Sequence, residues 1–103
     1  MPIDNQIAIA NMALYQYGRA IEWLRRSIAE NPDFPAALEH LTSVLALDDH
    51  EAEAIETLAR YLAHPRTNAK TIDQVRTQGR GPFAAAAFER YLQGLRKAGM
   101  PEE

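Results

Sequence analysis

Apolar residues recur at intervals of three and four along most of the chain, which is the spacing of one face of an α-helix. The pattern predicts six helices, over about 4–15, 17–30, 35–47, 49–64, 70–77 and 82–98. The segment 4–15 is apolar on more than one side, so its helix needs cover from more than one direction. We therefore expect an all-α fold.

Proline and acidic residues mark where the first four helices begin and end. Pro32 disfavours a helical conformation at the residue before it, and it therefore ends the second helix. Asp33 is a candidate N-cap for the third helix, whose first turn accepts Pro35. Asp48 and Glu51 have the spacing of a capping box, which predicts that Asp48 caps the fourth helix.

The last two helices are bounded by residues with known terminal preferences. Thr67 or Asn68 can cap the short fifth helix. Pro82 suits the first turn of the last helix, and Gly99 is a residue type that often closes one, with Pro101 just beyond. The last helix can cover the end of the preceding helices with a stripe of four apolar residues, Phe88, Tyr91, Leu92 and Leu95.

Two parts of the chain repeat each other in sequence. Ala20-Ile21-Glu22 recurs as Ala54-Ile55-Glu56, at the period typical of helix-turn-helix solenoid repeats. The repeat positions expected to define the core are Ala20, Leu24, Pro32, Leu41, Ala54 and Leu58. The fourth helix has four apolar positions at helical spacing, Ile55, Leu58, Ala59 and Leu62.

The first repeat resembles the tetratricopeptide repeat over residues 17–32, YGRAIEWLRRSIAENP. This stretch has an aromatic residue before the alanine, the small Ser27 where paired helices cross, and the Asn-Pro stop. The second repeat departs from the family pattern, with Tyr61 at the place of Ser27 and Pro65 one residue early. The resemblance implies a tetratricopeptide-like α-solenoid of two antiparallel helix pairs, followed by a short helix and a C-terminal capping helix.

The C-terminal third carries a second resemblance. Residues 88–102, FERYLQGLRKAGMPE, are similar to the ending that follows tetratricopeptide repeats in many proteobacterial class III adenylate/guanylate cyclase-like proteins and related regulators. The segments YLAHP at 61–65 and KTI at 70–72 also resemble that tail, whereas 78–82 departs from it. The resemblance implies the C-terminal regulatory segment of a larger signalling protein, with any cyclase chemistry located upstream.

We expect a single domain over 1–103, because a chain of this length supports one core. The first repeat is expected over about 4–32 and the second over about 35–65. A linker with the short helix is expected over 66–81, and the capping helix over 82–98.

The open N-terminal end of this array predicts self-association. Two repeats are fewer than the three or so that a solenoid needs, and the apolar first helix has no predicted cover. Either the chain is part of a longer array, or another copy of it buries the open end. Both alternatives predict a homo-oligomer, and we expect a dimer through the N-terminal helix.

The tetratricopeptide resemblance also implies a concave face lined by the first helix of each pair. The candidate partner-binding residues of this groove are Asn5, Ile9, Met12, Ala13, Glu39, Ser43 and Ala46. The groove contains no lysine or arginine to hold a peptide carboxylate, so the expected ligand is an amphipathic helix. The same face can instead pack against another subunit.

Composition and charge narrow the class of function. The chain has no cysteine, which excludes disulfides, thiolate nucleophiles and cysteine metal sites. No apolar run approaches the ~20 residues that cross a bilayer, and no signal peptide is recognisable, so we expect a cytoplasmic protein without membrane contact. Residues 1–65 carry four arginines against ten acidic residues, whereas 66–97 carry seven basic against two acidic residues. The basic C-terminal part can attract an acidic partner or the acidic part of a second copy.

The sequence offers few candidate residues for metal binding, catalysis or nucleic-acid binding. No two of the histidines His40, His50 and His64 have the four-residue spacing that places two imidazoles on one metal ion. Ser27 and Ser43 have no glycine-rich elbow around them. Basic residues of the last helix do not form a stripe interleaved with free aromatics, so nucleic acid is not an expected partner. We expect no catalytic residue, no cofactor and no metal.

The sequence thus predicts a non-catalytic protein–protein interaction or self-association module. The second resemblance places it at the C-terminus of a cyclase-like or transcriptional signalling protein. The alternative is a stand-alone small adaptor that binds an amphipathic helical peptide. An upstream catalytic or DNA-binding domain in the same reading frame would favour the first interpretation, and a natural start at Met1 the second.

Overall fold

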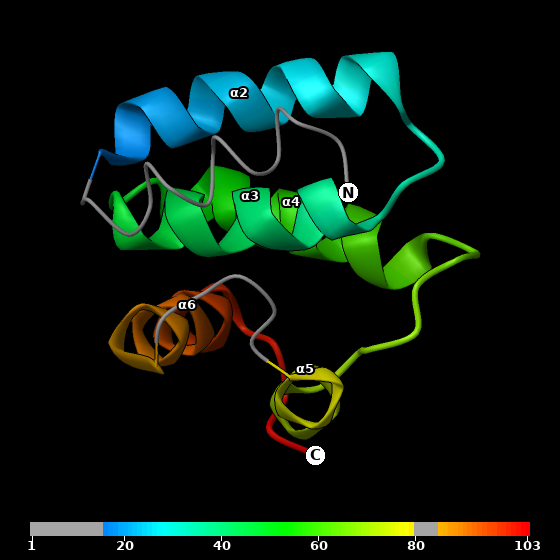
Figure 1. Cartoon of the computed structure of the whole chain (residues 1–103), viewed down its shortest axis with the longest axis vertical. Helices are drawn as coiled ribbons and strands as arrows, with labels where there is room; N and C mark the ends of the chain where they lie inside the picture. Colours follow the sequence, from blue (N-terminus) through cyan, green and yellow to red (C-terminus); the bar gives the residue numbers. More distant parts are fainter. Residues whose placement is uncertain (1–15, 80–84) are drawn as a thin grey trace.

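The computed structural model describes residues 16–79 and 85–103, which fold into five helices without a strand. With the labels of Figure 1, they are α2 (Tyr17–Glu30), α3 (Ala36–Leu47), α4 (Glu51–Ala63), α5 (Ile72–Gln78) and α6 (Ala85–Ala98). The prediction of an all-α fold is confirmed for these residues. The bounds predicted for the second helix are those of α2, whereas the helix predicted at 4–15 lies outside the described residues.

Helix α3 is the centre of the fold, because α2, α4 and α6 all pack against it. In Figure 1, α2 lies on one side of α3, α6 lies on the opposite side, and α4 runs behind it. Every side chain from His40 to Ala46 is buried. A helix covered on three sides can bury hydroxyl groups only if they find acceptors. Thr42 therefore donates to the Leu38 carbonyl at 2.8 Å, one turn back.

Helices α2 and α4 carry the two copies of the sequence repeat, and both pack against α3. Their repeated alanines, Ala20 and Ala54, are both fully buried. Leu24 and its repeat partner Leu58 also lie in the core, at 0% and 5% exposure. Of the other repeat positions, Leu41 on α3 is buried and Pro32 is exposed in the loop before it.

The predicted caps of α3 and α4 are not the caps that the structure has. Helix α3 begins at Ala36 with Pro35 at the N-cap position, so Asp33 lies outside it. Asp48 closes α3 rather than opening α4, and no side chain caps α4 at His50. The reason is the short connection between the two helices, which needs a left-handed residue and finds it in Asp49, at φ 63°.

Helix α5 begins later than predicted and is held at its N-terminus by two separate parts of the chain. Thr71, not Thr67 or Asn68, is its N-cap, and its hydroxyl accepts from the Gln74 amide at 3.1 Å. The Ile72 amide donates to the Pro101 carbonyl at 2.8 Å, and the next amide donates to the Glu102 carbonyl at 2.9 Å. The C-terminal tail therefore supplies acceptors for amides that the helix itself leaves unsatisfied.

Helix α6 ends as predicted and crosses α3 at close range. It ends at Ala98, and Gly99 takes a left-handed conformation with φ 108°. A Cβ atom added at Gly94 would lie 2.4 Å from the Ser43 Oγ and 2.6 Å from the Ser43 carbonyl oxygen. Glycine is therefore what allows the two helices to approach this closely. The predicted start of this helix at Pro82 lies outside the described residues.

Candidate functional site

The α3 half of the predicted concave groove is closed. Ser43 and Ala46 are fully buried, and α6 lies over this face of α3. The Ser43 hydroxyl donates to the Tyr91 carbonyl of α6 at 2.7 Å. These residues hold the capping helix and do not form an open binding surface. The other half of the predicted groove, Asn5, Ile9, Met12 and Ala13, lies outside the described residues.

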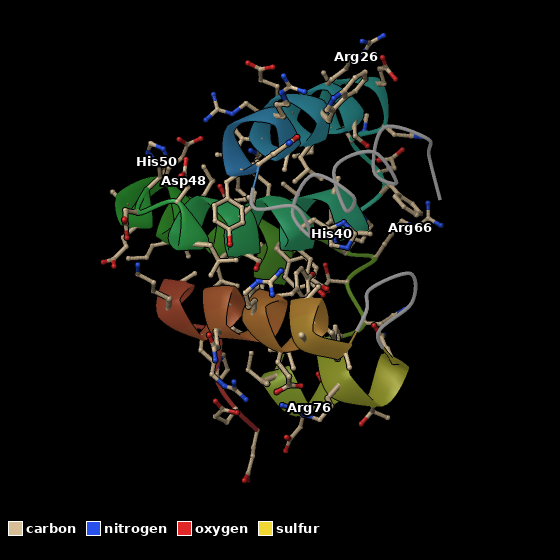
Figure 2. All side chains as sticks on the ribbon, turned by 60° about the vertical axis from the view of Figure 1, so that its left-hand side comes forward. Arg26, His40, Asp48, His50, Arg66 and Arg76 are labelled. Carbon is tan, nitrogen blue, oxygen red and sulfur yellow. The ribbon has the colours of Figure 1, made fainter. Side chains whose placement is uncertain are left out.

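The stripe predicted for the capping helix faces this closed groove. Tyr91, Leu92 and Leu95 are at most 2% exposed, and Phe88 is 7% exposed. The Phe88 and Tyr91 rings stack with their centroids 6.1 Å apart. The ring of His40 meets Tyr91 edge-on at 5.5 Å. In Figure 2, His40 lies on the side of α3 that faces α6.

Glu39, the third groove residue on α3, is the centre of a polar cluster inside the protein. Its Oε2 accepts from the Tyr61 hydroxyl of α4 at 2.7 Å, and its Oε1 accepts from the Tyr91 hydroxyl of α6. The Tyr61 hydroxyl also bonds to the Ala69 carbonyl, in the loop that precedes α5. One carboxyl group thereby joins three helices and a loop.

Burial sets the electrostatics of this cluster. Burial raises the pKa of Glu39, and hydrogen bonds from Tyr91 and Tyr61 oppose only part of that effect. Burial also raises the pKa of both tyrosines, and the neighbouring Glu39 adds to the increase. The pKa of His40 is lowered to about 4 because burial disfavours its charged form.

A small pocket of about 150 Å³ opens beside Glu39 and Tyr61. Its other lining residues are Pro35, Ala36, Arg66, Thr67, Asn68, Ala69 and Gln78. A pocket of this size, lined by both polar and apolar side chains, is too small for a peptide or a cofactor. The cluster is therefore organised as a structural joint, with solvent access on one side.

The described histidines and carboxylates do not assemble into a metal centre. No group of three or more of these ligand types is placed to hold an ion in the part of the chain that the structure describes. His50 lies 3.2 Å from Asp48, and the His64 Nε2 lies 3.1 Å from the Pro32 carbonyl oxygen. His40 is buried between α3 and α6, and its ring meets Tyr91 rather than another histidine.

The outer face of α4 carries Ile55, the most exposed large apolar side chain among the described residues. Ile55 is 56% exposed, Ala52 and Ala59 are exposed, and Leu62 is partly exposed. We call these four residues the α4 seam. The sequence named Ile55 and Ala59 as apolar positions of this helix, but the core contacts are made by the opposite side, through Ala54, Thr57, Leu58 and Tyr61.

Charged residues line both edges of the α4 seam. On the side of α6, the Lys97 Nζ lies 2.8 Å from Asp49 and 3.6 Å from Glu51. On the side of α2, Glu56 and Arg60 are exposed one turn apart, and neither forms an ion pair with another described residue. An apolar strip between charged edges is the usual anatomy of a protein contact surface.

No protein-family model, no curated protein and no solved structure matches the chain. None of the described helices combines the length and the apolar character that a membrane crossing requires. The candidate interaction surface is therefore argued from geometry alone. It is the α4 seam, where the described helices leave Ile55 exposed.

The α2 side of α4 contains a second, shallower depression of about 320 Å³. Arg25 of α2 and Glu53 of α4 bridge it with an ion pair of 2.6 Å. Its lining residues are Arg25, Ile28, Ala29, Leu41, Glu53, Thr57 and Arg60. Arg60 thus lies between this depression and the α4 seam.

Proposed function

We propose that this chain is a non-catalytic protein-interaction module that acts by self-association. The carrying observation is that α2 and α4, which repeat each other in sequence, both pack on α3 through equivalent positions, while α6 closes one face of α3. Stacked helix pairs of this kind act through the surfaces they present. The tetratricopeptide-like solenoid arrangement is part of this proposal.

The closure of α3 by α6 supports self-association over binding of a peptide in the concave groove. A ligand for that groove would need Ser43 and Ala46, and both are buried. Among the described residues, the most exposed large apolar side chain is instead Ile55 on α4. An apolar strip on an otherwise charged surface marks an interaction site.

The C-terminal segment of a cyclase-like or transcriptional signalling protein is the setting we propose for this module. The support is the sequence of residues 88–102, which forms most of α6 and the tail that follows it. In such a protein, self-association would bring two upstream domains together. The stand-alone adaptor is the second candidate, because the α4 seam around Ile55 offers an apolar surface to a foreign amphipathic helix.

The test is the solution mass of the chain by light scattering, from about 10 µM to about 1 mM and in low and high salt. Self-association predicts a mass that rises from monomer to dimer with concentration. A dimer that persists in high salt indicates an apolar interface, whereas a dimer lost in salt indicates an interface of exposed charges. A monomer under all conditions would contradict self-association and leave the adaptor as the function to test.

A further inference from the structure

We propose that a surface depression between α2 and α4 binds a small aliphatic carboxylate, with the charged end of the ligand paired to Arg60 and its alkyl chain over an apolar floor. The site is the depression of about 320 Å³ that α2, α3 and α4 line around the Arg25–Glu53 ion pair, and we call it the α2–α4 depression. None of its lining residues belongs to the α4 seam, so this inference does not depend on self-association.

The α2–α4 depression lies between two contacts that tie α2 to α4. At one end, the Arg25 guanidinium and the Glu53 carboxylate form an ion pair of 2.6 Å. One turn beyond Arg60, the His64 Nε2 lies 3.1 Å from the carbonyl oxygen of Pro32, which follows α2. The part of α4 that lines the depression runs from residue 53 to residue 60, which is about 10 Å of helix. The depression is therefore a short trough that is bridged at both ends.

The floor of the trough is mainly apolar, and its rim is charged. Leu41 and Thr57 are 3% and 4% exposed, so they lie at the bottom, and Ile28 is partly buried against the core. The Thr57 hydroxyl donates to the Glu53 carbonyl at 2.8 Å, so its hydrogen bond is made within α4. The side chains of Arg25 and Glu53 are about half exposed and lie at the rim. An apolar floor with a few charged groups is typical of small-molecule sites.

The charge of the rim favours an anion. Residues 1–65 carry four arginines against ten acidic residues, yet two of the four, Arg25 and Arg60, line this one depression. Glu53 neutralises Arg25. Arg60 is exposed and forms no ion pair with another described residue, although Glu56 precedes it by one turn. A guanidinium can hold a carboxylate through two parallel hydrogen bonds, so Arg60 is suited to the charged end of the ligand.

The dimensions of the trough set the size of the ligand. Its volume is near the lower end of the ~300–1,000 Å³ that small-molecule sites enclose. With C–C bonds of about 1.5 Å, an extended carboxylate of about eight carbon atoms has the ~10 Å length of the trough. Octanoate is therefore the probe that we choose. For its roughly ten non-hydrogen atoms, we expect a dissociation constant of about 0.1 mM to about 1 mM.

Titration of the ¹⁵N-labelled protein with octanoate, followed by two-dimensional NMR, tests the site. We expect saturating shifts that are largest for the amide signals of Ile28, Ala29, Leu41, Thr57 and Arg60. Hexanoate should bind about fivefold more weakly, because two CH₂ groups of the partly buried chain are missing. The absence of saturating shifts at about 10 mM octanoate would overturn the proposal.

Two further ligands of the same chain length test whether the site selects a negative charge. 1-Octanol is uncharged, and octylammonium carries the opposite charge. We expect octanoate to bind at least about fivefold more tightly than octanol, and octylammonium to bind more weakly than either. Equal binding of all three would indicate unselective adsorption to an apolar surface and would overturn the proposal.

The variant Arg60→Gln tests the residue that is assigned to the carboxylate. Octanoate should bind it about fivefold more weakly than wild type, whereas octanol should bind both proteins equally. Arg19→Gln is the matched control, because it removes the same charge from an exposed position of α2 outside the depression. Circular dichroism spectra that coincide with wild type show that both variants fold. Equal weakening by both variants would show that the net charge of the chain, and not Arg60, attracts the ligand.

The variant Glu53→Gln should change the affinity in the opposite direction. It removes the carboxylate that competes with the ligand for Arg25, so octanoate should bind about threefold more tightly. The ion pair is largely exposed and contributes little to stability, so we expect this variant to fold. Weaker binding of octanoate by Glu53→Gln would contradict the assignment of the arginines at the rim as the anion-binding groups.

Discussion

Glu39 shares the Tyr61 hydroxyl with a second hydrogen-bond acceptor, the Ala69 carbonyl. The Tyr61 hydroxyl lies within bonding distance of both the Glu39 Oε2 and the Ala69 carbonyl oxygen, but it supplies one proton. An ionised Glu39 and a backbone carbonyl are both acceptors without a proton to offer. Tyr61 can therefore donate to only one of the two at a time. Burial raises the pKa of Glu39, although the hydrogen bonds from Tyr91 and Tyr61 favour its ionised form and oppose part of that rise.

The charged groups around Glu39 do not offset the rise in its pKa that burial causes. On its own helix the neighbour is His40, whose pKa is lowered, so it is neutral near pH 7. From α4 and α6 it meets only the tyrosine hydroxyls, and Arg66 lines the pocket beside it without an ion pair to Glu39. Because the pKa of Glu39 is higher in the folded than in the unfolded protein, its contribution to stability is present below pH 4.5 and is lost as pH rises through the folded value.

The variant Glu39→Gln should not lose stability in this way as pH rises, because its amide does not ionise. The amide can donate to Tyr61 and accept from Tyr91, so we expect the variant to be within about 1 kcal/mol of wild type at pH 5 and to become relatively more stable as pH rises. Urea unfolding at a series of pH values measures the difference. Glu39→Ala, which leaves two buried hydroxyls without their acceptor, should lose about 2–4 kcal/mol. A Glu39→Gln protein that tracks wild type at every pH would contradict a raised pKa of Glu39.

His40 should give the opposite slope with pH. Its pKa falls from 6.5 to about 4 on folding, so the unfolded chain binds the proton more readily between these values. Stability should therefore fall by about 3 kcal/mol as pH is lowered through this window. His40→Gln should flatten the slope, measured by urea unfolding between about pH 4 and pH 7. His50→Gln is the control. Because His50 is exposed, this variant should retain the wild-type dependence of stability on pH.

The crossing of α3 and α6 depends on the missing side chain of Gly94. Gly94→Ala places a Cβ atom 2.4 Å from the Ser43 Oγ and 2.6 Å from its backbone oxygen, so α6 must shift. We expect a loss of about 1–3 kcal/mol in the free energy of unfolding, despite the higher helix propensity of alanine. Gly18→Ala is the matched control. It lies on α2 with nothing within 4 Å of the added Cβ, and it should be neutral or slightly stabilising.

The helices themselves could be predicted because their signals are local. The bounds of α2 follow from the periodic residues between Tyr17 and Glu30 and from the Asn-Pro that follows. The end of α6 follows from Gly99 in the same way. The prediction was wrong at Asp48, whose spacing to Glu51 indicated an N-cap of α4. Asp48 instead closes α3, because the chain turns toward α4 at Asp49, which has a left-handed conformation.

What could not be predicted is which side of each helix meets a partner. Helix α4 has apolar residues on two sides, and Ile55 or Ala59 suits a core as well as Leu58 does. Leu58 is buried and Ile55 is exposed because of where α3 and α6 pack against α4. Likewise, the closed groove depends on contacts between Glu39 or Ser43 and Tyr91, about half the chain away. Neither residue carries a local signal of that contact.

The arrangement around α3 predicts a gradient of local stability across the protein. Helix α3 is covered from three directions, whereas α5 has seven residues and leans on α6 and the C-terminal tail. Native-state hydrogen exchange should therefore find the slowest amides in α3 and the fastest helical amides in α5. Equal protection in α3 and α5 would show that the protein opens only as a unit.

Helix α6 is also a covalently attached occupant of the surface that it covers. A tethered segment reaches its site at an effective concentration of about 1 mM, without any need to diffuse. If α6 itself binds this face of α3 with an intrinsic dissociation constant of about 1 µM, the competition would weaken the binding of a free helix about a thousandfold. The Ser43–Tyr91 contact and the close crossing at Gly94 therefore decide how exclusive that surface is, as well as how stable the fold is.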